Sequence, residues 1–459
     1  MRIFGVLAAL LVAVIAGLFV WLYVSPPDLI RVGSNYSAKI VCSSVFVSGR
    51  NAQEVLEVDV QAPGHPLLRL MRVSVDRVSG TVRTGLFGVL GGGLAVHRDN
   101  AGCATVADGN VRAARLSVPE ITIDAPDPNL EWPAGGLVMP PENMDLDALL
   151  NDGNLTGPGM RAVVVVKDGK IIGERYGDGF DAETPLLGWS MTKTVTAAIT
   201  GTLIRDGELR RDQTGLLKEW SGDGRADISL ADLLGMAGDL VWNEGYGDVS
   251  DVTRMLYLEP DMAGFVAVKP FDTENDGGFG AAFNYSSGTS VLLSRIWQDQ
   301  FESKLDALAY PSQALFAPLG MQSAVFEADA RGTFVGSSYL YATARDWARF
   351  GQFLLQRGVW EGRSLLPVGF VDWMTDAHPA SGGIYGKGHL WLRAPNAWLP
   401  GENPELPEDA FFLSGHDGQS VSVVPSRGLV VVRLGLTPTD KAYKVGFLVH
   451  ELIDLLDEQ

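Results

Sequence analysis

The most prominent pattern in the sequence is a long apolar run near the amino terminus. Residues 3–24 carry no charged side chain, and as a helix they would rise about 33 Å, the thickness of a bilayer core. Arg2 precedes the run and Asp28 follows it, so the positive-inside rule predicts a cytoplasmic amino terminus, although Arg31 weakly favours the opposite orientation. A cleaved signal peptide is the alternative. We predict a single-pass inner-membrane anchor over residues 1–27, with the rest of the chain in the periplasm.

Short β-branched segments are frequent in residues 28–118, and they predict a small β-rich module. The segments that we expect to be strands are residues 40–41, 45–47, 55–60 and 71–75. The run Gly91-Gly92-Gly93 has no Gly-Lys-Ser/Thr sequence after it, so we interpret it as a turn cluster rather than a nucleotide-binding loop.

The module contains both cysteines of the chain, Cys42 and Cys103. A small even number fits an exported protein, so we predict that they form a disulfide, which would stabilise the module by roughly 4 kcal/mol. Two buried thiols are the alternative.

Five of the six histidines, all except His416, show no spacing typical of metal ligands. They are His65, His97, His378, His389 and His450. We expect no metal and no organic cofactor.

A proline-rich stretch separates this module from the rest of the chain. Six prolines fall between Pro119 and Pro141, so residues 119–160 are predicted to be a linker or a surface strap. Residues 161–459 then alternate strand and helix patterns, which predicts a mixed α/β sheet covered by helices. The expected strands are residues 162–166, 170–172, 421–424 and 429–435, and the expected helices are 191–205, 344–355 and 445–456.

Candidate chemistry begins at Ser190-Met191-Thr192-Lys193. At a helix start, residues three apart share one face, so Ser190 would lie near Lys193. The helix dipole favours developing negative charge there, and a lysine with a lowered pKa could accept the serine proton. Ser190 could also be a simple N-cap, and an α/β-hydrolase would require a second glycine in Gly188-Trp189-Ser190-Met191-Thr192, where Thr192 stands.

Two further motifs follow in order, Tyr285-Ser286-Ser287-Gly288 and Gly415-His416-Asp417-Gly418-Gln419. With them, residues 161–459 resemble the serine β-lactamase and penicillin-binding-protein superfamily, in its class C-like branch of esterases, D-aminopeptidases and 6-aminohexanoate-dimer hydrolases. The resemblance implies a β-lactamase-like fold, an antiparallel sheet flanked by helices with a helical subdomain. The segments that support it are residues 228–236, 242–248, 318–321 and 342–351.

The resemblance implies a role for each motif residue. Ser190 would be the acylated nucleophile, Lys193 its proton acceptor, and Tyr285 the group that relays the proton to the leaving group. The backbone N–H groups of Ser190 and Gln419 would form the oxyanion hole. The implied substrate contacts are His416, Gly418, Ser287, Trp242 and Tyr246.

Two departures from the family pattern concern the substrate. Ser287 stands where β-lactamases of this branch usually have Asn, and His416 stands where many relatives have Lys. Both positions lie on the substrate side, so small esters or amides are easier to accommodate than β-lactams.

The formal charge of −19 excludes an extended basic surface for nucleic acid. We therefore predict a membrane-anchored serine hydrolase that acts through an acyl-enzyme on small esters or amides. The alternative is a catalytically weak, penicillin-binding-like protein that binds cell-wall peptide or a partner.

Overall fold

The computed structural model describes residues 2–272, 280 and 282–458, except 117, 120 and 122. The chain divides into two compact units, which are described separately below. Unit 1 comprises Met1–Leu116, Asn243–Asp261 and Asp329–Arg331, and unit 2 comprises Ser117–Trp242, Met262–Ala328 and Gly332–Gln459. The amino-terminal module thus recruits two segments from much later in the chain.

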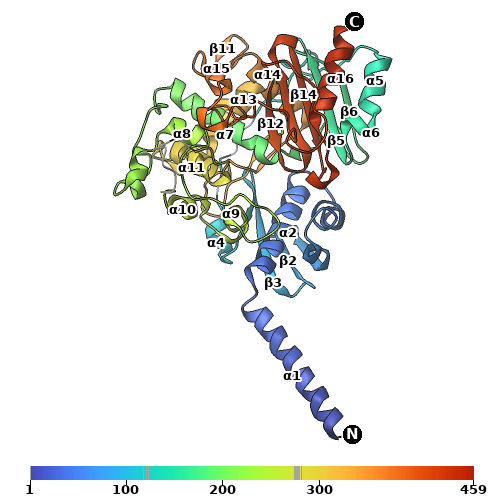
Figure 1. The fold of residues 1–459 in the computed structure, drawn as a ribbon, viewed down its shortest axis with the longest axis vertical. Helices are drawn as coiled ribbons and strands as arrows, with labels where there is room; N and C mark the ends of the chain where they lie inside the picture. Colours follow the sequence, from blue (N-terminus) through green and yellow to red (C-terminus); the bar gives the residue numbers. More distant parts are fainter. Residues whose placement is uncertain are drawn as a thin grey trace. The chain divides into compact units, whose positions relative to one another are not determined.

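Unit 1 combines helices with one antiparallel sheet in the order β1-β2-β3-β4 (Figure 1). Its strands are β1 (Met71–Asp76), β2 (Thr81–Leu86), β3 (Leu90–Arg98) and β4 (Gly102–Thr105). Its helices are α1 (Arg2–Val24), α2 (Asp28–Phe46), α3 (Ala52–Val55), α4 (Val111–Ala114) and α9 (Asp251–Leu258). The later segment α9 packs on α2, where the Tyr257 and Tyr36 rings lie 5.5 Å apart.

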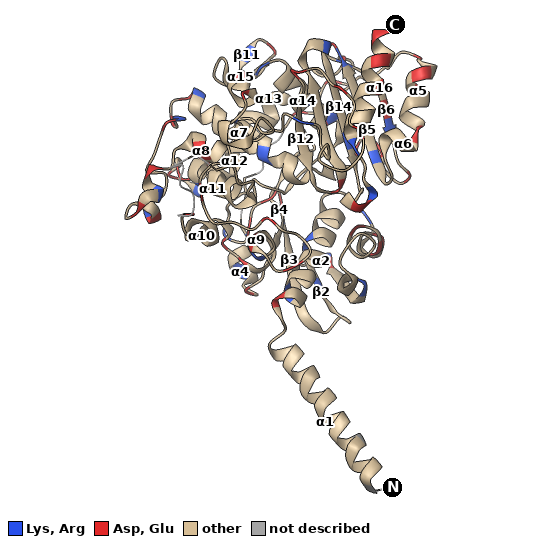
Figure 2. Cartoon of the chain, viewed as in Figure 1, with Lys and Arg blue, Asp and Glu red and all other residues tan. Residues whose placement is uncertain are grey.

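Helix α1 contains the predicted apolar run. Residues Ile3–Val24 are long and apolar enough to cross a membrane, with a mean hydropathy of 2.9, and none of those whose exposure the structure describes is buried. Figure 2 shows this helix without charged residues along the run. A membrane span and a signal sequence both have this character.

The first two predicted strands of the module, residues 40–41 and 45–47, are wrong. Residues 40–41 lie in α2, which ends at Phe46, just before Val47. Most of α2 is buried around its whole circumference, so its sequence lacks the one-sided apolar period of a surface helix. Its β-branched residues therefore resembled strand residues.

The predicted strand 55–60 is also wrong. Residues 52–55 form α3, and a π-helical segment, Leu56–Gln61, continues it. The Asn51 side chain accepts hydrogen bonds from the Gln53 and Glu54 amides at the helix start. Arg50 then binds the largely buried Asp59 carboxylate with Nη2–Oδ1 at 3.0 Å, which holds the helical turns together. The remaining predicted strand, 71–75, is confirmed as β1.

The glycine run 91–93 is not a turn cluster but lies inside β3. A Cβ atom on Gly91 would lie 2.4 Å from Ile30 Cγ2, and one on Gly93 would lie 2.4 Å from the Ser34 backbone. The glycines therefore let helix α2 pack directly on the strand. The Asn35 side chain completes this contact by accepting the Leu94 N–H at 3.1 Å.

The predicted disulfide is present in the structure. Cys42 on α2 bonds to Cys103 on β4, with 6.1 Å between their Cα atoms. It links helix α2 to β4, the last strand in the order of the unit 1 sheet. A disulfide of this kind fits an oxidising compartment outside the cytoplasm.

Unit 2 is built on a five-stranded antiparallel sheet in the order β12-β13-β14-β5-β6. These strands are β5 (Met160–Lys167), β6 (Lys170–Tyr176), β12 (Phe411–Gly415), β13 (Gln419–Val424) and β14 (Leu429–Gly435). Helices α5 (Met144–Asn151) and α16 (Val445–Asp457) pack on one face, and α14 (Ala344–Leu355) packs on the other (Figure 1). All four predicted strands and the three predicted helices of this region are therefore confirmed, to within a few residues.

The remaining elements of unit 2 include a helical layer and two small sheets. Its helices are α6 (Gly153–Thr156), α7 (Thr192–Arg205), α8 (Leu230–Leu234), α10 (Met262–Ala267), α11 (Ser287–Gln298), α12 (Lys304–Pro311), α13 (Ala317–Leu319) and α15 (Phe370–Thr375). The small sheets are β7-β9-β8 and β10-β11, formed by Leu186–Leu187, Leu340–Ala342, Val325–Phe326, Val359–Trp360 and Arg363–Ser364. This architecture is the predicted β-lactamase-like fold.

Part of the proline-rich segment, which belongs to unit 2, is held against α14. Arg349 of α14 is buried, and it donates to the carbonyls of Pro133 and Gly135 at 3.2 and 2.9 Å. It also pairs with the buried Asp346 carboxylate at 2.8 Å. Burial raises the pKa of Asp346 against the opposing effect of Arg349. Segment 342–351, which supported the family resemblance, therefore has a structural role through Asp346 and Arg349.

Candidate active site

Ser190 lies in a short 3-10 turn, Trp189–Met191, that leads directly into α7. The turn follows Gly188, where a Cβ atom would lie 2.2 Å from the Trp347 ring, so glycine is required for this close approach. Trp189 has φ +48°, an unusual conformation for a side-chain-bearing residue. The chain thereby places Ser190 half-buried at the start of α7.

Lys193 is 1% exposed and points back to Ser190. Its Nζ lies 2.9 Å from Ser190 Oγ, 3.1 Å from Ser287 Oγ and 3.1 Å from the Ser337 carbonyl oxygen. An amine in contact with two hydroxyls can exchange a proton with either of them. The predicted pair of Ser190 and Lys193 is therefore brought together.

Tyr285 joins the same cluster through its ring. Lys193 Nζ lies 4.8 Å from the ring centroid, within the range of a cation–π interaction. Trp391 and Tyr385 pack against this ring with centroid distances of 5.3 and 5.9 Å. Tyr285 is thus close to Lys193, and aromatic neighbours pack on its ring.

Ser287, predicted to contact substrate, is fully buried and accepts from Lys193. It begins α11, whose N-cap is Ser286, which accepts the Thr289 N–H at 3.1 Å. In this structure its hydroxyl is a hydrogen-bond partner of the Lys193 amine. A direct contact between Ser287 and substrate stays a prediction.

The third motif forms the tight connection between β12 and β13. Gly415, at the end of β12, lies against the turn that leads to Ser190, since a Cβ atom there would lie 2.2 Å from the Gly188 carbonyl oxygen. His416 follows, and its ring centroid lies 5.7 Å from that of Trp189. His416 is therefore next to the residue that precedes Ser190. The importance of Gly415 was not foreseen from the sequence, although it stands in a glycine-rich motif.

The His416 side chain is 46% exposed, and its Nδ1 lies 3.0 Å from the Asp417 carboxylate. Desolvation opposes protonation of this imidazole, but the attraction of Asp417 and its hydrogen bond are stronger in sum, so the pKa of His416 is raised. The position can therefore carry positive charge more readily than a free histidine.

Every carbonyl of the turn 416–418 is held from inside the protein. The Gln419 side chain donates to the His416 and Asp417 carbonyls at 3.0 and 3.3 Å, and Thr437 N–H donates to the Asp417 carbonyl at 2.8 Å. Gln419 is itself anchored on β14, because its amide exchanges two hydrogen bonds with the Gly435 backbone.

Arg433 completes this arrangement and was missed from the sequence. It is fully buried on β14, and its Nη1 donates to the Gly418 carbonyl at 2.9 Å. Because a trans peptide points its C=O and N–H in opposite directions, the Gln419 N–H points away from Arg433. A Cβ atom on Gly418 would lie 2.8 Å from Arg433 Nη1, so this glycine is explained by the guanidinium in addition to any approach of substrate.

His389 is a second residue that the sequence did not single out. It is 2% exposed, with Nδ1 2.8 Å from the Leu234 carbonyl oxygen and Nε2 3.0 Å from Ser290 Oγ. Its own carbonyl accepts from Thr194, beside Lys193. Burial lowers the pKa of His389 to about 3, so the ring is neutral behind the cluster. A lone histidine leaves no sequence signal for such a place.

Trp242 and Tyr246 are two further residues that were predicted to contact substrate. Trp242 is buried and packs on Gly288 of α11, where a Cβ atom would lie 2.7 Å from its ring. Tyr246 belongs to unit 1, where its hydroxyl lies 3.5 Å from Glu244 Oε1. A role of either residue in binding substrate stays a prediction.

Within the described part of the chain, no group of three or more His, Cys, Asp or Glu side chains could hold a metal ion.

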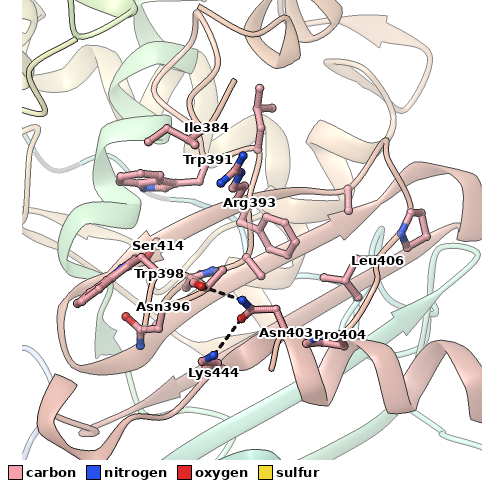
Figure 3. Close-up of a pocket in the computed structure, with 18 of the residues that line it drawn as sticks. Ile384, Trp391, Arg393, Asn396, Trp398, Asn403, Pro404, Leu406, Ser414 and Lys444 are labelled. Carbon is pink, nitrogen blue, oxygen red and sulfur yellow. Dashed lines mark hydrogen bonds between the residues drawn. The ribbon is translucent and has the colours of Figure 1, made fainter. Parts of the chain in front are cut away.

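A cavity of about 510 Å³ lies along the outer edge of β12 (Figure 3). Phe412 and Ser414 of β12 line it, with Ala410 just before the strand. The rest of the lining includes residues 391–398, 403–404 and 406–408. Trp391 pairs with Phe412 through two backbone hydrogen bonds of 2.9 and 2.8 Å, so the cavity wall continues the sheet. The volume is typical of a small-molecule site.

Comparisons with known proteins agree with this architecture. A 6-aminohexanoate-dimer hydrolase of Paenarthrobacter ureafaciens is 26% identical over 224 residues, which span 46% of this chain and 56% of that protein. This chain thus matches little more than half of that relative's length.

Solved structures show the same fold at low identity. A Bacillus anthracis protein assigned as a 6-aminohexanoate-dimer hydrolase has a TM-score of 0.57 at 20% identity, covering 73% of this chain and 89% of its own. The hydrolase EstCE1, described as having promiscuous acyltransferase activity, has a TM-score of 0.53 at 15% identity, covering 68% and 97%.

The family comparison covers more than half of the sequence. Residues 153–443 match the family described as Beta-lactamase, and this range includes Ser190, Lys193, Tyr285 and the 415–419 motif. Together with the five-stranded sheet and its covering helices, this match establishes that the chain belongs to the beta-lactamase family.

Proposed function

We propose that this protein is a serine hydrolase that forms an acyl-enzyme at Ser190 and acts on small esters or amides. The observation that carries the proposal is the 2.9 Å contact between Lys193 Nζ and Ser190 Oγ, with the lysine buried. A neutral amine has two N–H donors and one lone pair. Lys193 could therefore donate to Ser287 and the Ser337 carbonyl while it accepts the Ser190 proton.

Acylation then follows in balanced steps. Lys193 takes the Ser190 proton as Oγ attacks the substrate carbonyl carbon, and the carbonyl oxygen becomes an oxyanion. The N–H groups of Ser190 and Gln419 bind this oxyanion, and Arg433 and the Gln419 side chain fix the turn that presents the second donor. The lysine proton passes through the Tyr285 hydroxyl to the leaving nitrogen or oxygen as its bond to carbon breaks.

Deacylation repeats the chemistry with water. Tyr285 and Lys193 take a proton from water as its oxygen attacks the acyl carbon, and Ser190 Oγ recovers a proton when the carboxylic acid leaves. No redox partner is required. The similarity to the Paenarthrobacter 6-aminohexanoate-dimer hydrolase favours small amides as well as esters for this chain.

A fluorophosphonate probe tests the nucleophile. We expect the wild-type protein to be labelled and to hydrolyse p-nitrophenyl esters, and we expect Ser190→Ala to lose both. Ser426→Ala is the matched control, because Ser426 lies in the connection between β13 and β14. Absence of labelling in well-folded wild-type protein would refute the hydrolase and favour a protein that binds peptide without turnover.

We also propose that α1 anchors the protein in the inner membrane, with the catalytic unit in the periplasm. The uncharged run Ile3–Val24 and the disulfide support this location. We expect the full chain to fractionate with membranes and the chain without residues 1–27 to be soluble. Soluble full-length protein of unchanged mass would contradict the anchor, and a shortened mature protein would indicate a signal peptide.

A further inference from the structure

The turn between β2 and β3 exposes apolar side chains at one end of the unit 1 sheet. Phe87 is 58% exposed and Val89 is 54% exposed. Leu70, whose carbonyl accepts the Phe87 N–H at 2.9 Å, is 37% exposed. We call the surface formed by these three residues the β2–β3 tip. Three side chains are too few for a stable interface between proteins, which engages about 20 residues or more on each side.

The backbone of this turn does not favour phenylalanine. Phe87 and Gly88 have φ angles of +54° and +82°. The Val89 N–H donates across them to the Leu86 carbonyl at 3.2 Å. A type I′ turn requires positive φ at both central residues, and Asn-Gly is its favoured pair. Phenylalanine at the first central position is therefore unfavourable in conformation and leaves an apolar ring in water. An apolar environment for the ring would account for this residue.

The β2–β3 tip lies at the end of unit 1 from which α1 projects (Figure 1). Helix α1 lies close to β3. A Cβ atom on Gly91, two residues after Val89, would lie 2.4 Å from Ile30 Cγ2, and Ile30 follows the end of α1 by six residues. Trp21 and Tyr23 near this end are exposed aromatic residues of the kind that mark the interface between a bilayer and water. With α1 across a bilayer, the tip therefore lies at the level of the lipid headgroups.

Two exposed arginines lie beside the tip. Arg69 immediately precedes Leu70, and the Arg72 Cβ atom would lie 3.5 Å from a Cβ atom on Gly88. Arg72 Nη1 donates to the Arg69 and Met71 carbonyls at 3.4 and 2.8 Å. Among the described residues, no carboxylate pairs with either guanidinium. Their remaining donors are suited to phosphate oxygens, and anionic lipids attract basic side chains at a membrane surface.

We propose that the β2–β3 tip inserts into the interface of the bilayer that α1 spans, with Arg69 and Arg72 on the phosphates of its lipids. The proposal goes beyond the hydrolase function and rests on the membrane anchor proposed above. Three apolar side chains bind a bilayer only weakly by themselves, so the chain without residues 1–27 stays soluble. In the full chain, α1 holds the tip at the bilayer surface, and the second contact fixes the orientation of unit 1 on the membrane.

A fluorescent label at either end of β2 tests the proposal. The full chain is reconstituted in vesicles of phosphatidylcholine and phosphatidylglycerol, with the environment-sensitive dye NBD on a cysteine introduced by Val89→Cys or Val78→Cys. Val78 is the matched control, because it is a fully exposed valine in the β1–β2 turn, at the opposite end of β2. The six residues of β2 span about 20 Å. Cys42 and Cys103 are bonded to each other and do not take up the dye.

We expect the dye at position 89 to emit at shorter wavelength than the dye at position 78. Lipids with a nitroxide near the headgroup should quench it about threefold more strongly. Phe87→Asn suits the turn, so it should reduce the quenching at position 89 without lowering the melting temperature, whereas Phe87→Leu should retain the quenching. Arg69→Gln combined with Arg72→Gln should remove the increase in quenching that phosphatidylglycerol gives over phosphatidylcholine alone.

The same samples separate this contact from the anchor. Equally weak quenching at both positions of vesicle-bound protein, or quenching at position 89 that is unchanged in Phe87→Asn, would overturn the second contact and leave the anchor. A wavelength shift at position 89 that grows with the ratio of protein to lipid, without quenching by the lipids, would overturn it in favour of contact between copies of the chain. Full-length protein that stays outside the vesicles would remove the anchor and this contact with it.

Discussion

Lys193 and Lys444 are two buried lysines of unit 2 that differ in the chemistry of their acceptors. Lys444 Nζ donates to two carbonyls and one amide oxygen, and none of these groups can give up a proton. Lys193 Nζ contacts one carbonyl and two hydroxyls, those of Ser190 and Ser287. Both lysines are buried, so burial alone does not distinguish them. The hydroxyl neighbours of Lys193 are what the proposed mechanism requires.

The largest effect that this comparison predicts is the loss of activity in Lys193→Met. Methionine keeps the volume of the side chain but cannot accept the Ser190 proton, so we expect ester turnover to fall by about 10³-fold or more. The initial rate with p-nitrophenyl acetate and a thermal unfolding curve measure activity and folding together. A rate within tenfold of wild type would end the proposed mechanism, whatever the melting temperature.

A second prediction concerns the turn 416–418, which precedes the proposed oxyanion donor, the Gln419 N–H. Gln419→Leu removes the hydrogen bonds to the His416, Asp417 and Gly435 backbones, so we expect kcat to fall by about 10²-fold with little change in KM. Gln356→Leu serves as the control, because Gln356 is exposed at the C-cap of α14. A rise in KM at constant kcat would assign Gln419 to substrate binding instead.

A third prediction tests the neutral histidine behind Lys193. The folded pKa of His389, about 3, lies below the ordinary value of 6.5, so the unfolded chain binds more protons between these limits. This contribution to stability is complete above about pH 6.5 and is lost as the pH falls toward 3. The loss of stability between pH 7 and pH 4 amounts to about 3 kcal/mol.

Urea unfolding of wild type and His389→Gln from pH 7 to pH 4 measures this loss. The variant is expected to be less stable at pH 7 and to lose less stability on acidification. His450→Gln is the control, since the His450 side chain on α16 is 35% exposed. Parallel acid profiles for wild type and His389→Gln would show that His389 is not the group that titrates.

The smallest effect is expected for the other lysine. Lys444→Met leaves the Gly401 and Glu402 carbonyls and Asn403 Oδ1 without this donor, and it should lower the free energy of unfolding by about 1–3 kcal/mol. Turnover of p-nitrophenyl acetate should change less than threefold. A loss of activity comparable with that of Lys193→Met would abolish the distinction between the two lysines.

Local patterns predicted the elements of unit 2 well. Strands such as β5 and β14 are continuous β-branched runs beside turn residues, and α14 and α16 have the helical period of apolar residues. Each element is therefore recognisable from its own stretch of sequence. The pair Ser190 and Lys193 was predictable for the same reason, because a helical spacing of three fixes their contact.

The missed features depend on contacts between distant segments. Helix α2 is buried on nearly all sides and so lacks an amphipathic pattern, and the Gly93 position makes sense only when Ser34 is known to lie against it. Arg433 and His389 are single polar residues whose partners lie far away in the chain. No local period marks such positions, so only the folded arrangement identifies them.

The discontinuous make-up of unit 1 limits how the catalytic part can be isolated. Helix α9 lies between Ser190 and the Tyr285 motif in sequence, yet its buried residues Val252, Met255 and Leu256 belong to unit 1, where it packs on α2. A truncation that starts at residue 119 or 161 would strip α9 of that helix and leave an apolar stripe in water, which invites aggregation. A soluble version for crystallisation or kinetics should therefore begin at Asp28 and keep the disulfide-bonded helix.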